Sequence, residues 1–493
     1  MRQGFDNEKY LDLQSAHIKE RIAKFGGKLY LEFGGKLFDD YHASRVLPGF
    51  QPDAKFRMLE RMVDDVEVLV AINANDIEKN KVRGDLGITY DEDCLRLIDL
   101  FRDHGFLVGG VVITRFAGQG AAAAFRQRLT DVGVPVALHY PIEGYPHDID
   151  AIVSDEGFGK NDFVETTRPL VVVTAPGPGS GKMATCLSQL YHEHKRGVAA
   201  GYAKFETFPV WNLPLAHPVN VAYEAATVDL DDANIIDPFH LEAYDKKAVN
   251  YNRDVEAFPV LRALMERILG ASPYASPTDM GVNMVGFAIT DDEACGEASR
   301  MEIVRRYFHT AEAQRRTGQG AEQVARLRSL MRQAGVDEDC SPARAAALAR
   351  EQETGGPVGA MVLADGRVVT GKTSERLGAA SSLLMNALKT VAGVDLEQNV
   401  IDDAAINPIC HLKTEHLNSS NHRLHSDETL IALSITSGTS EVAARVIAAL
   451  PKLRGCDAFF SVIVSPTDEE IYRKLGINVC CEPKFERRTL YHR

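Results

Sequence analysis

A short glycine-rich stretch carries the clearest chemistry in this sequence. It follows the apolar run Val171–Thr174, reads Gly-Pro-Gly-Ser-Gly-Lys over residues 177–182, and precedes a helix-like segment. Glycines let the backbone approach an anion closely, a helix start offers unpaired N–H groups, and a lysine adds positive charge. We therefore expect a phosphate-bearing ligand, with ATP among the candidates, to bind at Gly177, Gly179, Ser180, Gly181 and Lys182.

The stretch departs from the full P-loop motif GxxxxGK[ST]. Pro176 replaces the first glycine of that motif, and Met183 replaces the Ser or Thr that ligates magnesium. Pro176 and Pro178 also lack the N–H groups that an anion-binding loop would use. The residues leave three interpretations open: a phosphate or nucleotide site, a site for another anion such as a substrate carboxylate, and a strand-to-helix turn without a ligand.

A second concentration of polar and aromatic residues lies in the irregular stretch from about 200 to 290. Loops of this composition often carry binding residues, although Asn, Asp and Pro are also ordinary turn formers. We take five of its side chains as substrate-binding candidates: His217, Asn220, Asn250, Asn252 and Arg253. His240 and Asp237 are the candidates for a general base, and no spacing selects between them.

Four of the fifteen histidines lie between His411 and His425. The spacing of His and Glu in this segment matches neither H-E-x-x-H nor H-x-x-E-H. Because Lys413 and Arg423 are interleaved with the histidines, we expect His411 and Lys413 to contact an anionic substrate rather than a metal. We also predict that three of these imidazoles line a cleft: His411, His416 and His422.

The elements around the glycine stretch alternate between apolar runs and amphipathic helical patterns. Five of the runs are typical of strands, at residues 29–33, 66–72, 106–113, 134–139 and 170–174. Such alternation predicts a parallel sheet that is covered on both faces by helices. Since ligands of open α/β sheets bind at the carboxyl ends of the strands, the glycine stretch would lie where a ligand is expected.

Composition divides the chain into four regions. These are a parallel α/β domain (1–200), a mixed polar-motif region (201–290), a helical insert rich in Ala, Arg and Glu (291–352) and a second α/β domain (353–493). The last region begins with a predicted hairpin, because an Asp-Gly turn at Asp365 lies between alternating runs. A helix at 381–391 and further strands alternating with helices are expected after it.

Bulk composition excludes several classes of protein. A length of 493 residues predicts two to four domains, and a net charge of -14 argues against a nucleic-acid partner. No apolar run is long enough to cross a membrane, and the charged N-terminus lacks an apolar signal core. The eight cysteines form no CxxC pair, so we expect no structural zinc. We expect a cytoplasmic protein with a small-molecule ligand, compatible with a homo-oligomer.

Four long motifs are more specific. They read LPLAHPVNVAYEAATVDLDDANIIDPFHLEAY, AVNYNRDVEAFPVL, SPTDMGVNMVG and GINVCCEP. With them the chain resembles, over essentially its whole length, a bacterial family known as domain of unknown function 1846. The resemblance brings no assigned activity. It implies a nucleotide-fold-like N-terminal domain, a helical insert and a C-terminal unit similar in topology to cytidine deaminases.

The sequence allows a check of the deaminase likeness. Zinc deaminases need a His or Cys ligand beside a Glu on the helix after the hairpin, and then a P-C-x-x-C pair. The expected helix, GAASSLLMNALK over residues 378–389, contains no His, Cys or Glu, and the chain contains no P-C-x-x-C. If the topology is shared, the zinc ligands are absent.

Together the residues favour an enzyme that binds a phosphate-bearing ligand or nucleotide and a small polar metabolite. A non-catalytic nucleotide-binding or regulatory protein is the first alternative, because Met183 cannot ligate magnesium. A metal-dependent hydrolase that uses the segment His411–His425 is the second. The sequence does not select between catalytic and non-catalytic roles, and it names neither the substrate nor the reaction.

Overall fold

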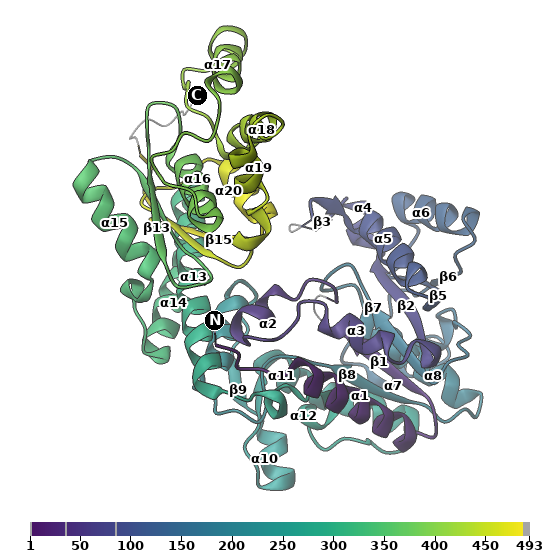
Figure 1. The fold of residues 1–493 in the computed structure, drawn as a ribbon. Helices are drawn as coiled ribbons and strands as arrows, with labels where there is room; N and C mark the ends of the chain where they lie inside the picture. Colours follow the sequence, from purple (N-terminus) through teal and green to yellow (C-terminus); the bar gives the residue numbers. More distant parts are fainter. Residues whose placement is uncertain (1, 35–36, 84–85, 487–493) are drawn as a thin grey trace. The chain divides into compact units, whose positions relative to one another are not determined.

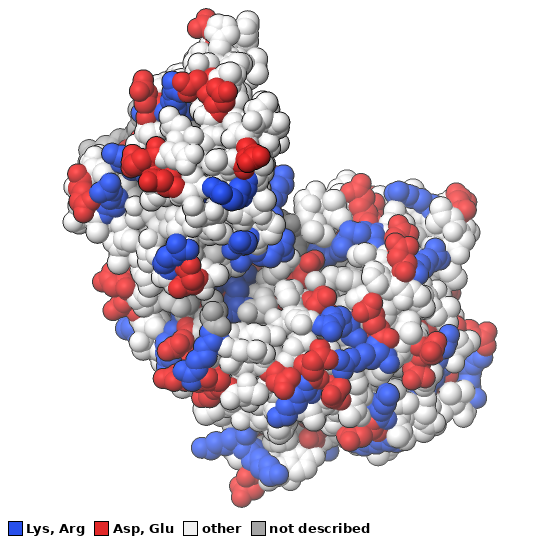
Figure 2. All heavy atoms as spheres, in the orientation of Figure 1, with Lys and Arg blue, Asp and Glu red and all other residues white. Residues whose placement is uncertain are grey.

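The computed structural model describes residues 2–34, 37–83 and 86–486, and the chain forms two compact units (Figure 1). The first unit comprises Arg2–Ser299 and the second begins at Arg300. Each unit has its own sheet and its own hydrophobic core. Acidic and basic side chains are interspersed over the surface that is visible in Figure 2.

The first unit is built on a seven-stranded parallel sheet in the order β11-β8-β1-β7-β2-β5-β6. In chain order the strands are β1 (Leu29–Phe33), β2 (Val66–Asn73), β5 (Leu107–Thr114), β6 (Val136–Leu138), β7 (Leu170–Thr174), β8 (Gly201–Phe205) and β11 (Gly281–Val282). The five strands predicted from apolar runs are confirmed, with small differences at their ends. The central strands β2 and β7 are buried along their whole length, as expected for a parallel sheet covered on both faces.

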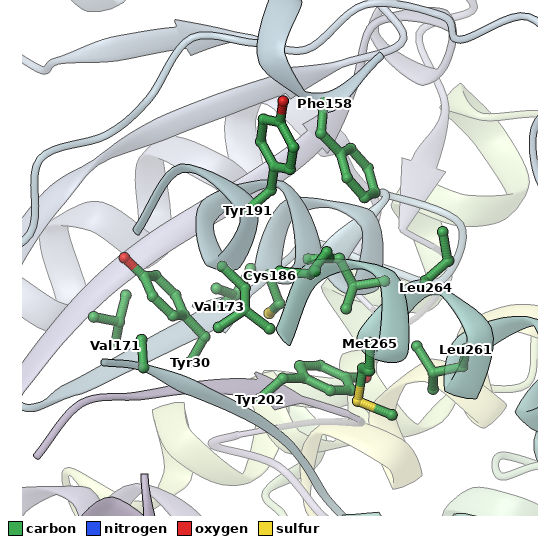
Figure 3. Close-up of a cluster of buried hydrophobic side chains, with 14 of the residues drawn as sticks. Tyr30, Phe158, Val171, Val173, Cys186, Tyr191, Tyr202, Leu261, Leu264 and Met265 are labelled. Carbon is green, nitrogen blue, oxygen red and sulfur yellow. The ribbon is translucent and has the colours of Figure 1, made fainter. Parts of the chain in front are cut away.

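Helices cover both faces of this sheet. On one face α8 (Lys182–Lys195) contacts the central strands, α11 (Asn252–Leu269) packs against α8, and α7 (Ile149–Ile152) packs against α11. Figure 3 shows the core between them, where strand and helix side chains meet: Tyr30, Val173, Tyr202, Cys186 and Met265. α5 (Tyr90–Asp103) contacts β2 and β5 and covers the other face, because right-handed crossovers in opposite directions lie on opposite faces.

The order of the strands creates a switch point at β7. From β1 the chain runs through β2, β5 and β6 toward one edge, then returns to insert β7 between β1 and β2. From β7 it moves the other way, through α8 to β8 and later to β11. The connections that leave β2 and β7 therefore diverge to opposite faces. In open α/β sheets this divergence opens a crevice at the carboxyl ends of the strands.

Smaller elements complete the first unit. Around the N-terminal half these are α1 (Asn7–Lys24), α2 (Tyr41–Val46), α3 (Ala54–Glu60), α4 (Ala74–Glu78), α6 (Gly120–Asp131) and the pair β3 (Val82–Arg83) and β4 (Ile88–Thr89). The polar-motif segment adds α9 (Pro218–Ala226), β9 (Asn234–Ile236), α10 (Pro238–Tyr244), β10 (Val249–Tyr251) and α12 (Pro277–Met280). These elements belong to the same compact unit as the sheet.

The second unit has a four-stranded sheet in the order β13-β12-β14-β15. Its strands are β12 (Val358–Val362), β13 (Val368–Lys372), β14 (Asp457–Phe460) and β15 (Asn478–Cys481), and β12 runs antiparallel to both of its neighbours. The predicted hairpin is confirmed as the β12–β13 pair. Its turn contains Gly366, whose φ of 85° is a left-handed value that favours glycine.

Helices fill the rest of the second half of the chain. They are α13 (Asp292–Thr317), α14 (Ala321–Ala334), α15 (Pro342–Thr354), α16 (Ala379–Ala392), α17 (Asp403–His411), α18 (Ser426–Ser437), α19 (Glu441–Ile447) and α20 (Pro466–Lys474). The expected alternation after α16 is wrong in one respect, because three helices lie between α16 and β14. In the part of the chain that the structure describes, no helix combines the length and apolarity needed to span a bilayer.

Candidate functional site

The glycine loop joins the carboxyl end of β7 to the start of α8, at the switch point of the sheet. Gly179 and Gly181 have φ values of 76° and 86°, in the left-handed region that favours glycine. Gly177 has a different requirement, since a Cβ atom there would lie 2.2 Å from the Tyr90 hydroxyl. Each of these three glycines thus has a local structural reason, which holds with or without a ligand.

Side chains from two neighbouring strands hold the loop in place. Thr114 at the end of β5 donates a hydrogen bond of 2.8 Å to the carbonyl of Ser180, and Asn73 at the end of β2 donates one of 3.2 Å to the carbonyl of Gly179. Ser180 Oγ donates to the carbonyl of Gly177 at 2.8 Å. No side chain among the described residues caps α8, so the first N–H groups of this helix are available to an anion.

Two charged groups lie near the start of α8. Lys182 is its first residue and is partly exposed, and Glu32 on β1 accepts a 2.7 Å hydrogen bond from the Tyr202 hydroxyl. Both act on the Cys186 thiol: burial raises its pKa well above the ordinary value, Glu32 adds to the rise and Lys182 opposes it. The start of α8, at the carboxyl ends of the strands, therefore lies near the ammonium group of Lys182 and the carboxylate of Glu32.

A largely buried charged cluster lies at the carboxyl end of β8, on the far side of β1 from the loop. We call it the Lys204 cluster; it consists of Lys204, Glu206, Tyr251 and Asp254. Lys204 Nζ pairs with Asp254, donates to the Tyr251 hydroxyl and lies 3.3 Å from Glu206 Oε1. Glu32 is the register partner of Lys204 on β1. This cluster was not predicted from the sequence.

The pKa values of the two carboxyl groups in the Lys204 cluster are shifted in opposite directions. Burial raises the pKa of Glu206 to about 8, Lys204 opposes the rise and the Asp254 charge adds to it. For Asp254 burial also disfavours the charge, but the Lys204 ammonium and hydrogen bonds outweigh it and hold the pKa below the ordinary value. Burial alone would lower the pKa of Lys204, yet Asp254, Tyr251 and Glu206 raise it well above the ordinary value. The raised pKa of Glu206 favours a protonated carboxyl group beside the Lys204–Asp254 ion pair.

Most substrate-binding candidates from residues 201–290 have local partners. Asn220 is buried and bonds both backbone groups of Val210, and the Asn252 side chain accepts from the N–H of Ala233 at 3.0 Å. The Asn250 side chain accepts from the N–H of Tyr251 at 2.9 Å, and Arg253 pairs with the buried Asp232. These contacts order loops within the unit and explain the polar composition.

His217 and Asp237 each begin a helix. Each is an N-cap residue followed by a proline in the first turn, which is a favoured helix start. Asp237 is fully buried; Oδ1 accepts from two backbone N–H groups, and Oδ2 accepts from the Thr278 hydroxyl at 2.6 Å. Both of its oxygens are engaged, which favours a capping role over that of a general base. His240 differs, because its ring lines a cavity of about 590 Å³.

The histidine segment lies in the second unit, at the end of α17 and in the π-helical turn that follows, Leu412–His416. His411, His416 and His422 are exposed, and the rings of the first two lie 5.5 Å apart. Lys413 is buried instead, and it donates to Glu428 at 2.7 Å and to the carbonyl of Arg423 at 2.6 Å. The Lys413 charge is thus paired inside the unit. The three imidazoles are exposed at the surface and do not line the cleft that the sequence predicted.

The described residues offer no ready metal site. Within them, no group of three or more His, Cys, Asp or Glu side chains is arranged to hold a metal ion. All eight cysteines are free thiols. The segment around His411 therefore lacks, in this part of the chain, the donor cluster that the metal-dependent alternative requires.

Comparison with known proteins gives consistent matches over the whole chain. A family model described as "Domain of unknown function DUF1846, N-terminal" matches residues 3–335, and one described as "Domain of unknown function DUF1846, C-terminal" matches residues 339–491. A UPF0371 protein of Corynebacterium aurimucosum is 58% identical over 99% of this chain and 98% of its own length. A UPF0371 protein of Streptococcus thermophilus strain CNRZ 1066 is 55% identical over 100% of both chains.

Proposed function

The chain belongs to the DUF1846 family, and we propose that its first unit is an enzyme domain that binds a phosphate-bearing ligand or nucleotide at the glycine loop. The observation that carries the proposal is the position of this loop. It lies at the switch point of an open parallel sheet, where such folds bind their ligands. It opens a helix without a side-chain cap, and Lys182 adds a positive charge there.

The proposed site differs from that of a magnesium-dependent NTPase. Met183 packs against the hydrophobic cluster below α8, so the residue after Lys182 offers no hydroxyl to a metal. Pro178 also provides no N–H within the loop. We therefore expect the loop to bind an anion through backbone N–H groups and Lys182, with little dependence on magnesium.

The Lys204 cluster favours a catalytic over a purely regulatory role. It lies along the same carboxyl edge as the loop, with only β1 between their strands. A carboxyl group whose pKa is about 8 holds its proton at neutral pH and is suited to general acid catalysis. Glu206 is therefore the acid that we assign to the proposed reaction, with Lys204 and Asp254 setting its protonation.

The second unit has a strand order that supports the deaminase likeness, but its sequence lacks the zinc-ligand motif. Its hairpin-first sheet, with β12 antiparallel to β13 and β14, supports a likeness in topology to cytidine deaminases. Helix α16 supplies neither the ligand nor the Glu that zinc deamination uses. We therefore assign this unit no zinc chemistry.

Calorimetric titration tests the proposed site. The ligands are ATP, pyrophosphate and inorganic phosphate, each with and without magnesium, and the proteins are the wild type, Lys182→Ala and Lys195→Ala. Lys195 is the matched control, because it ends the same helix and pairs with Asp155. We expect Lys182→Ala to weaken binding by roughly tenfold to a hundredfold, equivalent to about 1.4–2.7 kcal/mol, and the control to bind as the wild type. No binding in any protein, or equal affinity in all three, would remove the proposal.

A further inference from the structure

A cavity of about 590 Å³ lies beside the edge strand β11 in the first unit. Its volume is within the range of small-molecule sites. One wall is a stripe of α1 formed by Lys9, Leu13, His17 and Arg21, which recur every four residues along the helix. The opposite walls come from the segments after β8 and β11 and from α10 and α12.

Two aromatic rings form the apolar part of the cavity. Trp211 and Phe287 contact each other edge to face, with ring centroids 5.9 Å apart. The indole N–H donates to the carbonyl of Asn283 at 2.9 Å, which fixes the orientation of the Trp211 ring. Phe287 is 45% exposed, which is a large apolar surface for a ligand to cover. A flat, apolar molecule suits this part of the cavity.

The polar part of the cavity carries an excess of positive charge. Lys9 forms no ion pair with another described residue, and Arg21 donates to the carbonyl of Asp279. His240 is nearly buried, and its Nδ1 lies 3.0 Å from Ser276 Oγ. Its Nε2 forms no hydrogen bond within the described part of the chain. An imidazole nitrogen without a partner, in a lining that also holds two cations, can donate to the anionic end of a ligand.

Asp279 is the one carboxylate among the lining residues, and its charge is engaged by its neighbours. Oδ2 accepts from the Tyr244 hydroxyl at 2.7 Å and from the N–H of Ala275 at 3.1 Å, and Oδ1 lies 3.7 Å from His240 Nδ1. It therefore does not neutralise Lys9. The excess of positive charge among the lining residues disfavours a cationic ligand.

We propose that this cavity is a second ligand site of the first unit, for a small organic anion with a flat ring, of the aromatic carboxylate or aryl phosphate class. The ring contacts Trp211 and Phe287, and the anionic group is directed to Lys9, Arg21 and His240. Three strand spacings separate β11 from β7, roughly 14 Å. The site is therefore separate from the glycine loop and does not depend on anion binding there, although its lining residue Gly281 is the register partner of Lys204 on β8.

Trp211 is the only tryptophan of the chain, so its fluorescence reports directly on this cavity. Four probes separate the contributions: benzoate and phenyl phosphate carry both a ring and a charge, benzyl alcohol carries only the ring, and acetate carries only the charge. We expect a saturable fluorescence change with benzoate or phenyl phosphate, and binding at least about tenfold weaker with benzyl alcohol and acetate. The preferred anion identifies the ligand class.

Substitutions on α1 provide the matched pair. Lys9→Gln should weaken benzoate or phenyl phosphate binding by roughly threefold to tenfold and leave benzyl alcohol unchanged. Lys19→Gln is the control, because Lys19 is exposed on the same helix and does not line the cavity. Phe287→Ala should weaken every ring-bearing probe. Since Lys9 and Phe287 are exposed, both variants are expected to fold.

Four results would overturn the proposal. They are no saturable change with any probe, equal binding of benzyl alcohol and benzoate, equal weakening by Lys9→Gln and Lys19→Gln, and loss of the fluorescence response in Lys182→Ala. The last result would show that the cavity and the glycine loop are one site. Failure of phosphate binding at the loop, with the fluorescence response intact, would remove only the function proposed above.

Discussion

Thr114 Oγ1 donates a hydrogen bond of 2.8 Å to the carbonyl oxygen of Ser180, and so the end of β5 fixes the glycine loop that follows β7. Thr114 is almost fully buried, and Ser180 is fully buried. The contact crosses β2, which lies between β5 and β7 in the sheet. The shape of the loop is therefore set by the sheet and not only by its own glycines.

Removing this hydroxyl tests the role of the sheet. Thr114→Val keeps the size of the side chain and leaves the Ser180 carbonyl buried without its donor. We expect the free energy of unfolding of the first unit to fall by about 1–3 kcal/mol. Urea denaturation followed by circular dichroism measures the loss. Unchanged stability would mean that the loop adopts its conformation without Thr114.

The Lys204 cluster predicts unequal effects from its two carboxyl groups. Asp254→Asn leaves the largely buried Lys204 charge without its principal partner and should cost about 3–5 kcal/mol of stability. Glu206→Gln replaces a group that is protonated at neutral pH by one of similar shape and should cost less than about 1 kcal/mol. Chemical denaturation at pH 7 compares the two variants. Equal losses would show that both carboxyl groups are ionised.

The raised pKa of Glu206 also predicts how stability changes with pH. The folded chain keeps this proton up to a pKa of about 8, whereas the unfolded chain releases it near the ordinary value of 4.5. Between these values the folded state binds more protons, so the free energy of unfolding falls as pH rises. We expect the wild type to lose stability relative to Glu206→Gln across this window. A difference that stays constant between pH 4.5 and 8 would contradict the shift.

Local patterns in the sequence predicted the central strands of the first unit. The runs that became β1, β2 and β7 are apolar and bounded by turn residues, so their own residues indicate strands. The glycine loop was found in the same way, from its composition and its place after a strand. Sequence patterns predict features that are determined by residues close together in the chain.

The Lys204 cluster depends on contacts that no local pattern expresses. Lys204 and Asp254 come from β8 and α11, and they meet only because β8 lies beside β1 and α11 returns to the sheet. One signal was present: Lys204 and Glu206 alternate with phenylalanine at a strand end, which places both charges on one face. Two charged residues at the end of an otherwise buried strand were the clue.

Helix starts account for His217 and Asp237, which the sequence suggested as a substrate-binding residue and a general base. Both are N-cap residues followed by proline, and Ser276 begins α12 in the same way. A capping residue with proline behind it is a local pattern, so these positions could have been recognised from the sequence. The cavity residues on α1 could not, because their grouping depends on how α1 packs beside β11.

A pH-dependent ion pair stabilises the second unit. His425 Nδ1 lies 3.1 Å from Asp468 Oδ2, and Asp468 also accepts from the backbone N–H and hydroxyl of Ser426. The hydrogen bond to Asp468 raises the pKa of His425 above its ordinary value of 6.5. Burial opposes ionisation of Asp468, but its hydrogen bonds, that to His425 foremost, hold its pKa below 3.8.

The two pKa shifts define the pH range in which the His425–Asp468 pair stabilises the unit. A raised histidine pKa contributes stability that is complete below 6.5 and is lost as pH rises through the folded value. A lowered Asp pKa contributes stability that is present above 3.8 and is lost as pH falls through the folded value. We expect His425→Gln to reduce the melting temperature most at pH 5–6, between these two values, and progressively less toward pH 8. The reduction is measured by calorimetry, with the exposed His422→Gln as the control. A loss that is the same at pH 5 and pH 8 would show that the charge of His425 contributes nothing to the stability of the second unit.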